Sequence, residues 1–250
     1  MSALATHQLL TRRTVLRLQI TLASAAACLL LSGCTQWQAA AGDTVRSFIK
    51  QSHPADELRL RSDLQYLRVT TNGVPALLVL GDVDPSATPS RPVQVWYSAE
   101  GEVLRLQDGR LAGLTGTPVE WRNVALQAPA PAWPIAPTTV QNQYQYQRQR
   151  DTLPGDHIGI TEVVTVRPIT APSRHQLVQL DPGSLQWFEE TSAPPADAPA
   201  ALATTHRPLP PARYALRRTP TGLVPVYGEQ CLNADLCIQW QSWPPAPAQP

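Results

Sequence analysis

The chain has little of several residue types that many binding proteins use heavily. Its 250 residues include one methionine, two phenylalanines and a single lysine, Lys50. Basic and acidic residues nearly balance, at 20 and 19, and three of the basic ones, Arg12, Arg13 and Arg17, lie near the N-terminus in a stretch without acids. The rest of the chain is therefore slightly acidic, which gives no electrostatic footprint for a nucleic acid partner.

Motifs for catalysis and for metal binding are also missing. The sequence has no H-x-x-H or H-E-x-x-H pair, no G-x-S-x-G elbow and no phosphate-binding glycine loop. Two pairs of acids, Asp156 with Glu162 and Glu189 with Glu190, could serve a glycoside hydrolase only if they converged across a cleft. We therefore expect no enzyme, no cofactor and no metal site, and keep a polysaccharide-acting hydrolase as a third interpretation.

Cysteine is scarce, and its position near the N-terminus is informative. An apolar run over residues 18–31 ends in Leu31-Ser-Gly-Cys34, which has the spacing of a bacterial lipobox. This pattern predicts that residues 1–33 are a signal peptide and that Cys34 carries a lipid, so that a membrane is a partner through that lipid. An ordinary secretory signal that contains a cysteine is the alternative. The adjacent Arg12 and Arg13 fit either a twin-arginine or a Sec export signal.

The exported part contains two further cysteines, Cys231 and Cys237. Exported proteins meet an oxidising environment, so this C-x5-C pair predicts a disulfide. A metal site on two cysteines would need histidines nearby, and none lies within twenty residues of the pair.

Proline is plentiful and short strand patterns follow one another, which favours a mainly β fold. All 26 prolines come after residue 33, which disfavours long helices. Asn72-Gly73 and Asp108-Gly109 are strong hairpin signals between alternating segments. Together with weaker strands in the second half, they predict a large antiparallel meander sheet. Further expected features are a turn at 99–101, a strand at 141–150, a type II turn at 181–183 between strands 175–180 and 185–189, a hairpin at 219–222, and a short helix at about 44–51.

The composition suggests one domain over residues 34–250. A Pro/Ala-rich insert covers about residues 126–139, and a linker-like loop covers about residues 192–212. Either segment could divide two halves of one fold.

Tryptophan is the unusual abundance, with seven in the chain. An indole within a strand commonly packs in a core. Its face also suits the C–H face of a sugar ring, and an arginine beside it could hold an acidic sugar. The candidates for glycan stacking are Trp96, Trp121, Trp187 and Trp240, with Arg110 beside them.

Several of these segments resemble the YjbF/GfcB family of bacterial lipoproteins. The resemblance rests on LRVTTNGVPALLVLG at 67–81, VWYSAEG at 95–101, LQDGR at 106–110 and GLTG at 113–116. It extends more loosely through Glu162, Val163 and Val164 to WQSW at 240–243 and covers most of residues 40–245. These are strand and turn motifs, so the resemblance brings no catalytic residues.

The resemblance implies a curved antiparallel sheet, or half-barrel, of many strands. It also implies an outer-membrane lipoprotein, facing the periplasm, that assists capsule or exopolysaccharide production. Thr35, rather than Asp, follows Cys34, which in lipoproteins implies release to the outer membrane. The expected partners are a polysaccharide or proteins of the export machinery. The alternative is a periplasmic carrier whose concave face holds acyl chains: an apolar lining would favour lipid, whereas Trp, Tyr, Arg and Gln would favour glycan.

Overall fold

The computed structural model describes part of the chain, namely residues 59–85, 91–127, 132–133, 143–198 and 208–245. The chain divides into two compact units, Met1–Gln51 and Ser52–Pro250, and every described residue belongs to the second. The expected signal peptide, Cys34 and the helix at 44–51 lie outside the described residues. Across these described ranges, no helix is both long and apolar enough to cross a membrane.

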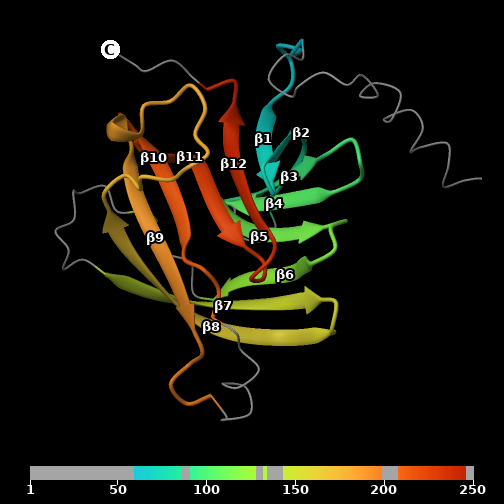
Figure 1. Ribbon diagram of the computed structural model, residues 1–250, viewed down its shortest axis with the longest axis vertical. Helices are drawn as coiled ribbons and strands as arrows, with labels where there is room; N and C mark the ends of the chain where they lie inside the picture. The colour runs from blue at the N-terminus through green and yellow to red at the C-terminus, as the bar shows by residue number, and fades with distance from the viewer. Residues whose placement is uncertain (1–58, 86–90, 128–131, 134–142, 199–207, 246–250) are drawn as a thin grey trace, which may run out of the picture. The chain divides into compact units, whose positions relative to one another are not determined.

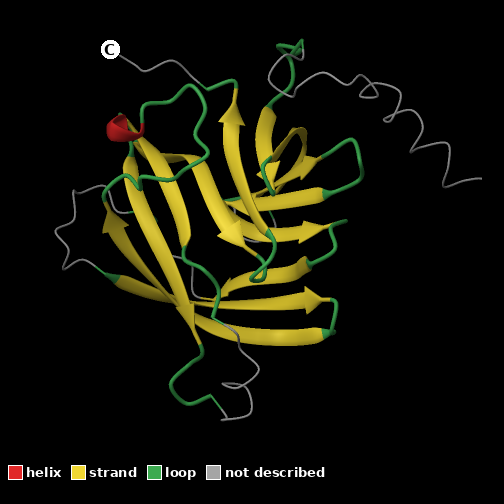
Figure 2. Ribbon diagram, in the orientation of Figure 1, coloured by secondary structure: helices red, strands yellow, loops and turns green. Residues whose placement is uncertain are grey.

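The second unit is built on twelve strands that follow one another along the chain (Figures 1 and 2). The strands are β1 Tyr66–Thr71, β2 Val74–Asp84, β3 Val93–Tyr97, β4 Val103–Gln107, β5 Arg110–Thr115, β6 Glu120–Gln127, β7 Tyr144–Leu153, β8 His157–Ile169, β9 Gln186–Ala193, β10 Ala212–Thr219, β11 Gly222–Cys231 and β12 Cys237–Trp243.

Every strand pairs antiparallel with its neighbours in sequence, and β1 also pairs with β12. This last pairing runs the whole length of β1, from Tyr66 opposite Trp243 to Thr71 opposite Ile238. The prediction of a large, curved antiparallel meander is thus confirmed. The curvature goes further than the expected half-barrel, because the sheet continues until its first and last strands meet. Closure pairs the N–H and C=O groups that two edge strands would otherwise leave open.

The turns of the first hairpins have the backbone that their sequences predict. Asn72 and Gly73 have φ values of 50° and 82°, and Asp108 and Gly109 have values of 51° and 75°. Two successive positive φ values match the right-handed twist of the flanking strands, and Asn-Gly and Asp-Gly adopt them at low cost. The expected turns at 99–101 and 219–222 also connect paired strands.

The predicted hairpin around Asp181 is wrong. Residues 182–184 form a short 3-10 turn capped by the Asp181 side chain, and residues 175–180 are not a strand. Instead Leu177 and Leu180 pack against Trp187 on the outer face of the sheet. Covering this apolar patch on β9–β11 removes hydrocarbon from water, which favours the packed conformation of residues 175–180.

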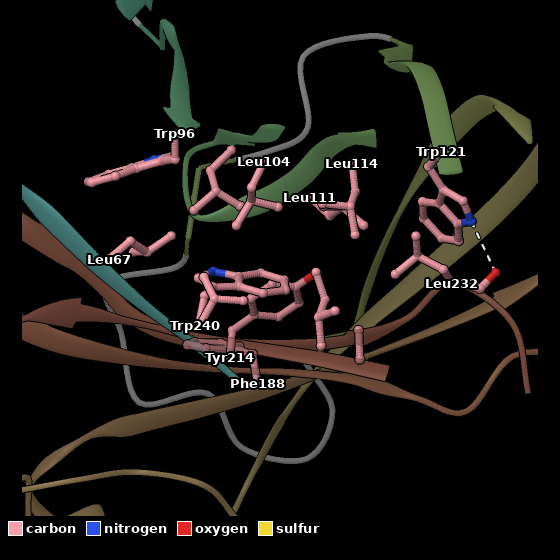
Figure 3. Packing of buried hydrophobic residues seen from close by; sticks show 14 of the residues in the cluster. Leu67, Trp96, Leu104, Leu111, Leu114, Trp121, Phe188, Tyr214, Leu232 and Trp240 are labelled. Atoms are coloured by element: carbon pink, nitrogen blue, oxygen red, sulfur yellow. Dashed lines mark hydrogen bonds between the residues drawn. The ribbon is translucent and has the colours of Figure 1, made fainter. Parts of the chain in front are cut away.

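The core fills the inside of the ring (Figure 3). In Figure 1, β9–β12 run roughly along the vertical and β4–β7 roughly across it, so two parts of the coiled sheet face each other. Leu104, Leu111 and Leu114 lie on one side of the core, and Phe188, Tyr214 and Trp240 on the other. Gly228 lies opposite Trp240 in the β11–β12 pairing, and a Cβ there would come within 2.5 Å of the indole ring. Glycine therefore lets this indole lie flat on β11.

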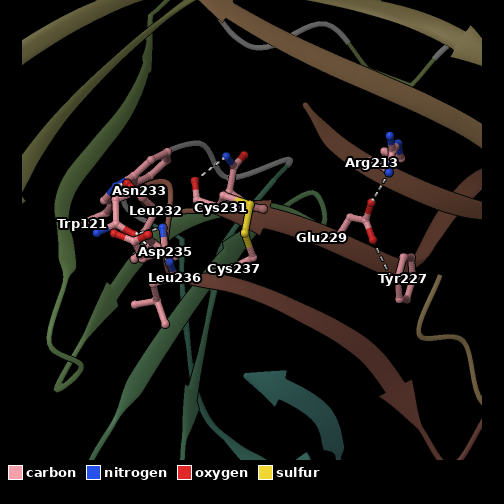
Figure 4. The surroundings of a disulfide bond; sticks show 11 residues. Trp121, Arg213, Tyr227, Glu229, Cys231, Leu232, Asn233, Asp235, Leu236 and Cys237 are labelled. Carbon is pink, nitrogen blue, oxygen red and sulfur yellow. Dashed lines mark hydrogen bonds and ion pairs between the residues drawn. A yellow bond between two sulfur atoms is a disulfide. The ribbon is translucent and has the colours of Figure 1, made fainter. Parts of the chain in front are cut away.

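The disulfide lies at the β11–β12 turn (Figure 4). Cys231 and Cys237 are bonded to each other and are partners in the strand pairing, which confirms the predicted disulfide. Between them, Leu232 enters the core, and its carbonyl oxygen accepts a hydrogen bond of 3.0 Å from Trp121 Nε1. Leu232 therefore anchors the hairpin tip in the core.

Replacing Cys231 and Cys237 with serine is expected to lower the free energy of unfolding by about 2 kcal/mol. The bond spans a sequence separation of 6, and a short loop constrains the unfolded chain less than a long one. Urea denaturation of the oxidised wild type and the double variant measures the difference. Reduced wild type should match the double variant, and a loss above about 4 kcal/mol would contradict the loop-length argument.

Candidate functional site

Three arginines and two glutamates lie buried inside the ring. Of these five, the sequence analysis selected Arg110 as a glycan-binding candidate and named Glu162 and Glu190 only as possible hydrolase acids. Arg148 donates to Glu162 from Nε and Nη2 at 3.0 and 2.7 Å, and Arg150 donates from the same two atoms at 3.1 and 2.8 Å. Both guanidinium groups also lie over the ring of Trp121, at 4.9 and 4.4 Å. Glu162 thus holds two cations in place while an indole covers them.

The second buried ion pair joins Arg110 and Glu190. Arg110 Nε donates to Glu190 at 2.8 Å, Arg110 Nη2 donates to Tyr144 at 3.0 Å, and the guanidinium lies 3.5 Å from the ring centre of Trp133. Burial opposes the charge on Arg110, but Glu190 offsets it, and the pKa of Arg110 rises. Burial raises the pKa of Tyr144 to about 12, with Arg110 opposing the shift and Glu190 adding to it. Arg110 is therefore fully occupied and is not available to an acidic sugar.

The acid pairs considered for hydrolysis do not converge. Glu190 faces the core, where Tyr146 donates to it, whereas Glu189 faces outward and accepts from Arg167 and Arg213. Glu162 is fully buried, while Asp156 is exposed in the β7–β8 turn. Over the described ranges, the His, Cys, Asp and Glu side chains form no group of three or more that could hold a metal ion.

An aromatic pocket opens at the end of the ring where β1 begins and β12 ends. It has a volume of about 500 Å³ and is lined by three indoles, those of Trp96, Trp240 and Trp243. We call it the indole pocket. Figure 3 shows Trp96 and Trp240 on facing walls of the core, with Leu67 beside them. The polar and charged side chains that share the lining are Gln65, Tyr66, Arg91, Gln94, Asp108, Tyr227 and Ser242.

Among the residues that the structure describes, one polar atom of this pocket lacks a hydrogen-bond partner, whereas the Asp108 carboxyl has a long contact of 3.5 Å with Arg110 Nη1. Trp96 Nε1 is buried and has no hydrogen-bond partner in the described part of the chain, although a buried donor without an acceptor costs about 1–3 kcal/mol. Burial raises the pKa of the Asp108 carboxyl, while Arg110 and Arg91 act in the opposite direction. The indole pocket thus combines aromatic faces with groups that can form further hydrogen bonds.

The structure brings together only two of the five candidate glycan-stacking residues. Trp96 and Trp240 both border the indole pocket. Trp121 has no exposed surface and its ring is covered by two guanidinium groups, so it has no face for a sugar. Trp187 is buried on the outer face beside Tyr227, and its Nε1 donates to the carbonyl of Pro182. Arg110 is held by the contacts described above.

Sequence reasoning missed some features of the site. It counted Trp243 among the tryptophans but did not select it, although WQSW places Trp240 and Trp243 three residues apart at the end of a strand. It left open which side of the strand containing Tyr146, Arg148 and Arg150 faces water, and the structure puts these three side chains inside. The signal that could have located them is Glu162, on the strand that follows.

The fold is similar to that of a solved structure described as the hypothetical lipoprotein YmcC from Escherichia coli (K12). The two superpose with a TM-score of 0.53 at 14% sequence identity, over 83% of this chain and 97% of that chain. A scan against protein-family models and a search of curated proteins gave no match. At this level of identity, the likeness establishes the fold alone.

Proposed function

We propose that this chain is an exported lipoprotein that binds a glycan in its indole pocket and assists exopolysaccharide or capsule production without catalysis. The observation that carries the proposal is the pocket itself, where Trp96, Trp240 and Trp243 meet amide, hydroxyl and carboxyl groups. Aromatic faces suit the C–H faces of sugar rings, and a few well-placed polar groups give orientation and specificity.

The lipobox and the fold support the exported, lipid-anchored part of the proposal. Leu31-Ser-Gly-Cys34 would place the lipid on Cys34, and Thr35 favours an outer-membrane location facing the periplasm. The fold resembles that of a protein described as a hypothetical lipoprotein, which is consistent with the proposed assignment to the YjbF/GfcB family.

The interior of the ring argues against the acyl-chain carrier. A carrier needs a dry apolar cavity, whereas the interior contains the charged side chains of Arg110, Arg148, Arg150, Glu162 and Glu190. Placing a hydrocarbon chain against these ion pairs would cost free energy, because it would exclude polar partners without replacing them.

Trp243→Ala is expected to weaken binding of the purified surface polysaccharide about 5- to 150-fold, because stacking on an aromatic ring contributes on the order of 1–3 kcal/mol. Calorimetry on the folded proteins measures the affinity. Tyr97→Ala is the matched control, since Tyr97 is exposed on the outer face of strand β3 and does not line the pocket.

Deleting the gene tests the cellular role. We expect less surface polysaccharide, restored by the wild type and not by the Trp243→Ala variant. An unchanged polysaccharide with an altered lipid composition of the outer membrane would instead favour the carrier. If the deletion strain loses polysaccharide and the Trp243→Ala variant restores it fully, the indole pocket is not required. The function would then depend on an export-machinery partner that binds elsewhere on the surface.

A further inference from the structure

A second, larger cavity lies at the opposite end of the ring, where the β7–β8 turn and the disulfide hairpin meet. Its volume is about 860 Å³. Arg150 is part of the cavity lining, although only 6% of its surface is exposed. We call it the arginine cavity.

Arg150 is held rigidly and still has capacity to bind. Its Nε and Nη2 donate to Glu162, and its guanidinium plane lies 4.4 Å from the ring centre of Trp121. Its third nitrogen, Nη1, has no acceptor among the residues that the structure describes. A buried, fixed guanidinium with unused N–H groups is a ready donor to an oxyanion.

The charges around this arginine are not balanced. Arg148 and Arg150 share the single carboxylate of Glu162, because the other buried acid of the interior, Glu190, is engaged by Arg110 and Tyr146. The Arg148–Arg150–Glu162 cluster therefore has one excess positive charge, and a buried charge is stabilised when an opposite charge approaches it.

The rim of the cavity limits how much negative charge a ligand can bring. Asp156, Asp197 and Asp235 line the cavity and are exposed, as is His157. Because solvent screens these three carboxylates, they repel a singly charged ligand only moderately. They repel a doubly charged ligand more strongly. The cavity thus favours a single negative charge that reaches past the rim to Arg150.

We propose that the arginine cavity binds the carboxylate of an acidic sugar through Arg150 Nη1. Gln147, Thr152 and Thr161 supply neutral hydrogen-bonding groups for the sugar hydroxyls, and Ile158, which is 81% exposed, supplies an apolar wall. This site lies at the other end of the ring from the indole pocket. A variant can therefore lose binding at one site and keep it at the other, so the two proposals are tested separately.

Sodium glucuronate is the probe, and NMR chemical-shift titration of the folded protein is the measurement. We expect saturable shifts of the backbone amides around Gly159 and Asn233, which line the cavity. Methyl glucoside, which lacks the charge, and inorganic phosphate, which is largely doubly charged at pH 7.5 or above, should both bind more weakly. Equal binding of methyl glucoside, or tighter binding of phosphate, would overturn the proposal.

Two variants test whether glucuronate binds at Arg150. Arg150→Gln should weaken glucuronate binding about 10- to 100-fold, since a hydrogen bond to a charged group is lost, and it should fold because Arg148 and Glu162 remain as a balanced pair. Asp235→Asn, at the exposed rim, should strengthen binding about 2-fold or more by removing a repelling charge. Unchanged binding in Arg150→Gln, or weaker binding in Asp235→Asn, would contradict the assignment. Tyr97→Ala is the control, since Tyr97 is exposed and lines neither cavity, and its Gly159 and Asn233 amides should titrate with glucuronate as those of the wild type do.

Discussion

Glu162→Gln is expected to lower the free energy of unfolding by about 3 to 5 kcal/mol. The carboxylate is fully buried and accepts hydrogen bonds from both Arg148 and Arg150. Burial opposes the charge on Arg148, but Glu162 more than offsets it and raises the pKa of that guanidinium. A neutral amide would leave two buried cations beside each other, with no counter-charge of their own.

Urea denaturation measures this loss, and Glu189→Gln is the matched control. Glu189 also accepts from two arginines, but their side chains are 53% and 32% exposed for Arg167 and Arg213. Water can solvate these cations when the carboxylate is removed, so we expect a loss of no more than about 1 kcal/mol. Equal losses in the two variants would contradict the importance of burial.

A triple replacement separates the cost of unpaired charge from the value of the ion pairs. Changing Arg148 and Arg150 to methionine and Glu162 to leucine removes all three charges while keeping apolar volume. Buried ion pairs replaced in this way commonly leave stability unchanged or higher. The triple variant should therefore be more stable than Glu162→Gln, and a triple variant that is less stable would show that the charges themselves stabilise the fold.

Trp121→Ala is the second large effect, with an expected loss of about 3 to 5 kcal/mol of unfolding free energy. The side chain has no exposed surface, and its removal leaves a cavity beneath Arg148 and Arg150. It also removes the donor to the Leu232 carbonyl, which anchors the disulfide hairpin in the core.

Trp121→Phe separates packing from the hydrogen bond in the same denaturation experiment. Phenylalanine keeps an aromatic face for the guanidinium groups but cannot donate to Leu232. We expect it to recover about half of the loss or more. A phenylalanine variant as unstable as the alanine variant would assign the effect to the hydrogen bond rather than to the packing of the ring.

Local sequence determined the strands and most of their turns. Asn72-Gly73 and Asp108-Gly109 adopt the positive φ values that glycine and asparagine or aspartate tolerate, and the flanking alternation sets which residues face the core. The disulfide likewise followed from Cys231 and Cys237 in a chain whose N-terminal pattern predicts export. These features depend on a few neighbouring residues, so the sequence alone could predict them.

Only the tertiary structure decided the features that depend on contacts between distant residues. Ring closure pairs β1 with β12, the two most distant strands in the chain, and the burial of Arg110 depends on Glu190, 80 residues later. Residues 175–180 have a strand-like pattern, yet they cover Trp187 because that outer patch exists only once β9–β11 have formed. Among the tryptophans, Trp96 and Trp240 border the pocket while Trp121 and Trp187 do not. All four are buried, so the place of each ring in the closed sheet, which only the tertiary structure sets, separates them.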